Sequence, residues 1–281
     1  MNELRVGSVI SGRFELVQPA GSGAMGVVWE AHDQQSGRAV AIKLLRPFAG
    51  VVDAAERLRR EAMVLMELSH PAIVQLFDVA VRDDGTLVLA MEMLRGRTLR
   101  EHLYDVGTLT PAELVPIIDG LCSALDEVHR AGVVHRDLKP DNIFLVDEAS
   151  REPGAPPAKL IDFGIAKIFW DSPMTGPGGA LGTPRYMTPD QLREDIVIDG
   201  RSDQYALAVV IYECLAGTLP YPRGSEIIGA VANANTMPLR QVMRDAPAAI
   251  EAVLEKALSH LAVDRYPTAR AFAKAFSDAA L

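Results

Sequence analysis

The chain has 281 residues, enough for one large domain or two lobes with a substantial core. It carries 28 Lys and Arg against 37 Asp and Glu. The resulting formal net charge of −9 argues against nucleic acid as the main partner, because that role needs a concentrated basic surface. Cys122 and Cys214 lie far apart in apolar segments, so neither a zinc site nor a disulfide framework is expected.

No targeting or membrane segment is expected. Residues 1–12 lack the cationic stretch and the apolar run of a signal peptide. The most apolar later segment, 205–215, is too short to span a bilayer and contains Glu213. The sequence therefore predicts a cytoplasmic protein.

The first ninety residues read as short strands broken by turns. Strands are predicted where β-branched and aromatic residues gather, at 14–17, 27–30, 40–45, 73–81 and 87–91. One long helix, 53–68, interrupts this series, because its apolar residues recur at helical spacing.

After Gly96 the pattern becomes helical. Thr110 followed by Pro111 predicts the start of a long helix, whose apolar residues recur as far as Val128. Further helices are expected at 203–216, 227–232, 248–258 and 269–276. The segment 148–158 is rich in Pro, Ala and charged residues and predicts a surface loop. The change near residue 95 indicates a small β lobe joined to a larger α lobe.

A glycine-rich stretch lies between two of the predicted strands. It consists of Gly21, Ser22, Gly23, Ala24, Met25 and Gly26. Glycine lets backbone N–H groups approach phosphate oxygens without side-chain hindrance. Alone, the stretch would be interpreted as a β-turn made of glycines. A strand follows it rather than a helix, which disfavours a dinucleotide site.

Lys43 is a charged residue near the end of an apolar predicted strand, so its ammonium group needs a partner or access to solvent. On the next predicted helix, Glu61 shares one stripe with Leu58, Leu65 and Leu68. A carboxylate in an apolar stripe is costly unless it is paired. We therefore predict a Lys43–Glu61 pair that holds the ammonium against phosphate groups; the alternative is a Glu61 at a solvent edge.

Two further segments carry side chains suited to phosphoryl transfer. In the segment 135–142, Asp137 can accept the proton of a hydroxyl substrate, and Lys139 can neutralise charge on the transferred group. Asn142 offers an amide oxygen to a hard divalent cation, and Asp162, at a predicted strand end before Phe-Gly, offers a carboxylate.

In this order, the motifs resemble those of the eukaryotic-like (Hanks-type) protein serine/threonine kinases. The residues within them are most similar to those of the bacterial branch. The resemblance covers about residues 12–278. It implies an α+β, two-lobed protein kinase fold. The small antiparallel β lobe with one helix would be 12–92, the hinge region 93–96 and the larger, mainly α lobe 97–278.

The resemblance also implies an activity and its partners. ATP and Mg²⁺, or Mn²⁺, would be the cofactors, and proteins with Ser or Thr hydroxyls would be the substrates in a signal-transduction role. Lys139 matches the Ser/Thr rather than the Tyr kinases. The family pattern permits a homodimer through the small lobe.

Further residues acquire roles only through the resemblance. Those matched to the adenine pocket, gatekeeper and hinge are Val28, Ala41, Phe144, Met91, Glu92, Met93 and Leu94. Those matched to a stacked spine are Leu65, Leu76, His135 and Phe163. In the segment matching the activation loop we predict Thr175 as the main autophosphorylation site and Ser172 as the second. Residues 182–187 would form the platform for the substrate residue that follows the phosphoacceptor.

One departure from the family pattern and two alternative functions remain. The usual Ala-Pro-Glu appears as Thr188-Pro189-Asp190, so we expect a longer or water-bridged ion pair between Asp190 and Arg265. A pseudokinase scaffold is one alternative, but the residues it usually loses are all present: Lys43, Asp137, Asn142 and Asp162. A small-molecule kinase is the other, and it would generally lack the peptide platform.

Overall fold

The computed structural model describes residues 4–23, 26–45, 62–82, 84–163, 184–193, 198–222, 227–233 and 235–280. These residues form two compact units. We call the described residues of 1–70 and 74–95 the β unit, and those of 71–73, 96–164 and 174–281 the helical unit. Each unit is described by itself.

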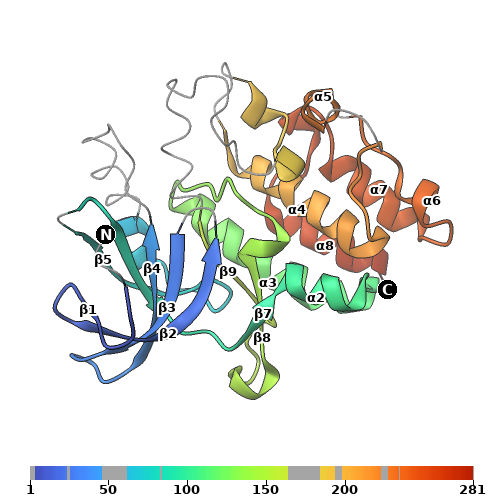
Figure 1. Cartoon of the computed structure of the whole chain (residues 1–281). Helices are drawn as coiled ribbons and strands as arrows, with labels where there is room; N and C mark the ends of the chain where they lie inside the picture. The colour runs from blue at the N-terminus through green and yellow to red at the C-terminus, as the bar shows by residue number, and fades with distance from the viewer. Residues whose placement is uncertain are drawn as a thin grey trace. The chain divides into compact units, whose positions relative to one another are not determined.

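The β unit is built on an antiparallel sheet of six strands in the order β1-β2-β3-β4-β6-β5 (Figure 1). The strands are β1 (Val9–Ile10), β2 (Phe14–Gly23), β3 (Gly26–Asp33), β4 (Ala39–Leu45), β5 (Leu76–Val81) and β6 (Leu87–Glu92). Of the helix predicted at 53–68, only 62–67 lie among the described helical residues, and the remainder falls mainly outside them. The strand predicted at 73–81 begins later, at Leu76.

One face of this sheet carries a hydrophobic core. Successive side chains of a strand point to opposite faces. On β4, Val40, Ile42 and Leu44 pack in that core, together with Trp29 from β3. Lys43 therefore belongs to the opposite face of the sheet, although the strand reads as continuously apolar around it.

The helical unit contains seven labelled helices among its described residues (Figure 1). They are α2 (Leu99–Val106), α3 (Pro111–Arg130), α4 (Gly200–Ala216), α5 (Ile227–Ala232), α6 (Leu239–Val242), α7 (Ala248–Ala257) and α8 (Ala269–Ala280). A small sheet of β7 (Gly96–Thr98), β8 (Ile143–Val146) and β9 (Ala158–Leu160) accompanies them. Short 3-10 turns are η1 (Pro140–Asn142), η2 (Glu148–Ser150), η4 (Pro184–Tyr186), η5 (Asp190–Leu192) and η6 (Ala262–Asp264).

Local sequence explains where these helices begin. Thr98 and Thr110 cap α2 and α3, and each is bonded to the N–H of a Glu three residues later, which bonds back. α4 is different, because nearly every residue from Ser202 to Leu215 is buried. A helix buried all round has no amphipathic stripe. The helix α4 starts at Gly200, three residues before the predicted start at residue 203.

The predicted surface loop 148–158 joins β8 to β9 and includes η2. Its Pro156 packs against α3, where a Cβ added to Gly120 would lie 2.6 Å from the Pro156 Cβ. Among the described residues, no helix has the length and apolar character needed to cross a membrane.

Candidate active site

The segment 135–142 is held in place by one buried carboxylate. Asp203 of α4 accepts hydrogen bonds from the backbone N–H groups of His135 (2.8 Å) and Arg136 (2.9 Å), and its Oδ2 lies 2.7 Å from His129 Nε2. Arg136 has a φ of 62°, which a non-glycine residue adopts only when its surroundings hold it there. Asp203 therefore fixes the shape of this loop.

His135 is fully buried and packs rather than reacts. Its ring lies 4.7 Å from the ring of Phe163, centroid to centroid. Burial lowers the pKa of His135, so the imidazole is neutral at pH 7. His135 and Phe163, two of the residues matched to the stacked spine, are thus in ring contact.

Asp137 lies at the centre of a compact cluster. Its Oδ2 accepts from Lys139 Nζ at 2.8 Å and from Asn142 Nδ2 at 3.0 Å, and Asn142 Nδ2 also lies 2.8 Å from the Asp137 carbonyl oxygen. An ammonium and an amide thus hold the carboxylate in one orientation. A base so fixed can orient a hydroxyl group for attack.

Asn142 and Asp162 are brought to neighbouring strand ends. The register of β8 and β9 pairs Ile143 with Leu160, and the N–H of Ile161 donates to the Asn142 carbonyl oxygen at 3.0 Å. Because Asn142 Nδ2 is bonded to Asp137, its Oδ1 is the side-chain atom suited to bind a cation. Asp162 has a φ of 55°, a strained conformation typical of functional positions.

In the β unit, four of the residues matched to the nucleotide share one face of the sheet. Val28 lies opposite Lys43, Lys43 opposite Leu89, and Ala41 opposite Met91. Directly opposed residues share a face, and Ala41 and Lys43 are two positions apart on β4. This is the face away from the hydrophobic core.

The glycine-rich stretch forms the end of the β2–β3 hairpin, with Gly23 paired to Gly26. A Cβ at Gly26 would collide with the carbonyl oxygen of Leu44, so only glycine fits there. Gly21 and Gly23 have no atom within 4 Å of an added Cβ. At the other end of the sheet, the Glu92 N–H already donates to the Gln75 carbonyl oxygen at 2.9 Å, so a ligand contact there must use another group.

The structure thus assembles the predicted residues in two groups. The helical unit holds Asp137, Lys139, Asn142, Phe144 and Asp162. The β unit holds Gly21, Ser22, Gly23, Gly26, Val28, Ala41, Lys43, Met91, Glu92 and Leu94. The remaining predicted residues, Ala24, Met25, Glu61, Ser172 and Thr175, lie outside the described residues.

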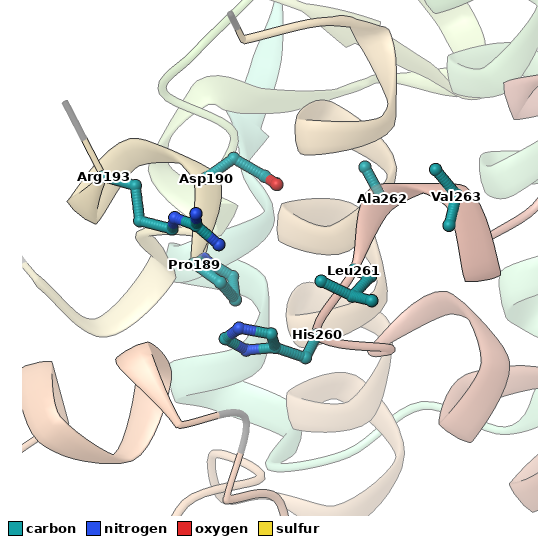
Figure 2. A pocket seen from close by; sticks show the side chains of 7 residues that line it. All are labelled: Pro189, Asp190, Arg193, His260, Leu261, Ala262 and Val263. Atoms are coloured by element: carbon teal, nitrogen blue, oxygen red, sulfur yellow. The ribbon is translucent and has the colours of Figure 1, made fainter. Parts of the chain in front are cut away.

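The expected long or water-bridged contact between Asp190 and Arg265 is wrong. Arg265 Nη1 lies 2.6 Å from Asp190 Oδ2, and both side chains are buried. Three backbone carbonyls, of Ser259, His260 and Arg201, also accept from this guanidinium. They hold Arg265 close enough for the shorter carboxylate. A mainly apolar pocket of about 250 Å³ lies beside Asp190. Figure 2 shows the residues that line it: Pro189, Asp190, Arg193, His260, Leu261, Ala262 and Val263.

Sequence reasoning missed a polar cluster around Glu213. This carboxylate of α4 accepts from the Tyr186 hydroxyl at 2.5 Å and from Arg100 Nη1 at 2.9 Å. The signal was present, because Glu213 interrupts the most apolar segment of the chain. Like Glu61, Glu213 is a carboxylate among apolar residues and therefore needs a partner.

Comparison with known proteins places the chain in a family. Residues 14–274 match the protein kinase domain. The chain is 37% identical over 273 residues to the probable serine/threonine-protein kinase PknB of Corynebacterium glutamicum, covering 93% of this chain and 41% of that protein. It is 34% identical over 267 residues to the serine/threonine-protein kinase PrkC of Bacillus subtilis, covering 94% of this chain and 40% of that protein.

A solved structure agrees. The crystal structure of the Mycobacterium tuberculosis PknI kinase domain has a TM-score of 0.79 and 29% identity, and the match covers 98% of this chain and 99% of that chain. The expected α+β, two-lobed kinase fold is confirmed. The chain spans about two fifths of the length of the curated relatives named above. The chain belongs to the protein kinase domain family, among relatives that are bacterial serine/threonine kinases.

Proposed function

We propose that the chain is the catalytic domain of a protein serine/threonine kinase, which transfers the γ-phosphoryl group of ATP to Ser and Thr hydroxyls of proteins. The observation that carries the proposal is the cluster around Asp137, in which one carboxylate oxygen accepts from Lys139 and from Asn142. This arrangement combines a fixed base, a cation and a candidate metal ligand in the short segment 137–142.

Asp137 would accept a hydrogen bond from the substrate hydroxyl and take its proton as the new P–O bond forms and the bond to the leaving ADP oxygen breaks. Lys139, 2.8 Å from that carboxylate, would also stabilise charge on the moving phosphoryl group. Lys43 would hold the nucleotide phosphates from the β unit. The glycine-rich hairpin would offer N–H groups to the same phosphates.

The family uses ATP and a divalent metal ion, and the residues present fit such an ion. Asn142 and Asp162 supply oxygen atoms, which hard cations such as Mg²⁺ prefer. Among the described residues, no group of three or more His, Cys, Asp or Glu side chains could hold a metal ion. Asn142 and Asp162 would therefore share the ion with phosphate oxygens and water. When bound, the ion neutralises charge on the β- and γ-phosphate oxygens.

The finer features are part of the same proposal. We propose that the domain comprises residues 12–278 and that it works in the cytoplasm. We also propose that Thr175 and Ser172 are its autophosphorylation sites. Mn²⁺ would substitute for Mg²⁺, and the chain would form a homodimer through the β unit. Mapping of phosphosites after incubation with ATP tests the sites directly. Finding neither residue modified would remove that part of the proposal and leave the kinase activity standing.

The test is transfer of radiolabelled phosphate from ATP to myelin basic protein and to the chain itself. Asp137→Asn keeps the size of the side chain but removes the base, and we expect transfer to fall by at least about a hundredfold. Comparable transfer by the variant and the unaltered chain would contradict the role of Asp137. No observation favours the pseudokinase or the small-molecule kinase.

A further inference from the structure

Arg100 joins three separate segments of the helical unit. It lies in the first turn of α2 and reaches Glu213 of α4, with Nη1 2.9 Å from Oε1. Its Nη2 donates to the hydroxyl of Tyr186, which in turn donates to Glu213. Its Nε lies 3.5 Å from Asp141 Oδ2. One guanidinium therefore links α2 to α4, to the η4 turn and to the η1 turn.

The cluster is sheltered enough for these bonds to matter. The side chain of Glu213 is 15% exposed and that of Arg100 is 37% exposed, while Tyr186 is buried. Burial, followed by the hydrogen bond to Glu213, raises the pKa of the Tyr186 phenol well above its usual range, so it remains a donor. Removing the guanidinium would leave Glu213 a largely buried charge with one neutral partner.

The segments that Arg100 connects are the ones the proposed reaction needs together. Tyr186 ends the turn that the family resemblance matches to the peptide platform. Asp141 directly precedes Asn142, the candidate metal ligand. Five residues after Tyr186, Gln191 Nε2 donates to the Arg136 carbonyl oxygen at 2.7 Å. The described residues 184–193 are thus attached to the segment 135–142 through Gln191 and to Arg100 and Glu213 through Tyr186.

We propose that Arg100 is a positioning residue for the protein substrate: through Tyr186 and Glu213 it sets the peptide platform relative to the loop that carries Asp137. This inference rests on the proposed kinase function. It assigns Arg100 an effect on binding of the protein substrate rather than on binding of ATP, because the contacts described above involve none of the residues matched to the nucleotide.

The experiment measures kcat and KM separately for myelin basic protein and for ATP. For Arg100→Met we expect the KM for myelin basic protein to rise about tenfold, since a hydrogen-bonded charge is lost, while the KM for ATP stays within about twofold. Tyr186→Phe removes the hydroxyl alone and should give a smaller change in the same KM. The double variant should be no worse than Arg100→Met by more than about twofold, because both act through one cluster.

Arg97→Met is the matched control. Arg97 is a neighbouring Arg whose ion pair with Asp105 is exposed on both sides, and its loss should alter neither KM. Arg100→Lys keeps the charge and should recover part of the substrate affinity. If Arg100→Met does not fold, Tyr186→Phe and Arg100→Lys still decide the question.

Three results would overturn the inference: an equal rise in both KM values, no change in either, or the same effect from Arg97→Met. An unaltered chain that transfers no phosphate would instead overturn the proposed function, and the inference with it. The two failures are therefore distinguishable.

Discussion

Asp203→Asn is expected to weaken the helical unit by disrupting the support of the segment 135–142. Two backbone N–H groups and one imidazole point at the two carboxylate oxygens of Asp203. An Asn side chain has one acceptor oxygen and turns an NH₂ donor toward the other partner. At least one of the N–H groups of His135 and Arg136 then loses its acceptor.

The magnitude follows from burial. Asp203 is 1% exposed, so water cannot replace the lost acceptor. Losing a hydrogen bond to a charged group and leaving a buried donor unpaired costs about 1.5–3 kcal/mol of unfolding free energy. For a chain of this size that corresponds to a fall in Tm of roughly 3–12 °C.

Thermal unfolding followed by circular dichroism measures this difference. Asp199→Asn is the control on the same helix, because the exposed Asp199 caps α4 through the Arg201 N–H at 2.8 Å and Asn caps a helix equally well. The control should melt within about 1 °C of the unaltered chain. If Asp203→Asn melts in that same narrow range, Asp203 is not the carboxylate that supports the segment 135–142.

Three further outcomes are expected. Lys43→Met should abolish phosphotransfer and leave the circular dichroism spectrum unchanged, and near-normal turnover would contradict the role of Lys43. Chelation of Mg²⁺ should stop transfer even at saturating ATP and re-addition should restore it; activity that persists in chelator would speak against a metal at Asn142 and Asp162. In the β unit, the hydrogen bond from Arg13 holds the pKa of Asp33 well below its usual range. Asp33 therefore stabilises the folded chain above its unfolded pKa of about 4, and this stabilisation is lost as the pH falls through the lower folded pKa. The Tm difference between the chain and Asp33→Asn should shrink as the pH falls below about 4, and a constant difference would contradict this.

The parts of the fold that depend on local rules could be predicted from the sequence. Thr110 and Pro111 mark the start of α3 because capping and a fixed proline φ act within one turn. The β2–β3 hairpin is marked by its glycines. The end of α8 is less well marked: the helix continues to Ala280, beyond the predicted end at Phe276. Phe276 is its last buried residue, and the small and polar residues that follow carry no apolar periodicity.

Features that depend on long-range contacts could not be predicted in this way. The need for glycine at residue 200, the first residue of α4, is one of them: a Cβ there would collide with the His129 ring, which is distant in sequence. The direct ion pair of Asp190 and Arg265 is another, because the carbonyls that hold Arg265 come from two separate segments. Sequence could flag Glu213 as a carboxylate in need of a partner, but not that Arg100 and Tyr186 are those partners.

The central claim is that the chain moves the terminal phosphoryl group of ATP to Ser and Thr hydroxyls. Incubation of the unaltered chain and myelin basic protein with ATP labelled at the γ- or the α-phosphorus, followed by identification of the labelled amino acids, tests it most directly. We expect label only from γ-labelled ATP, carried by phosphoserine and phosphothreonine. Label on tyrosine alone, label from α-labelled ATP, or no label at all would contradict the account.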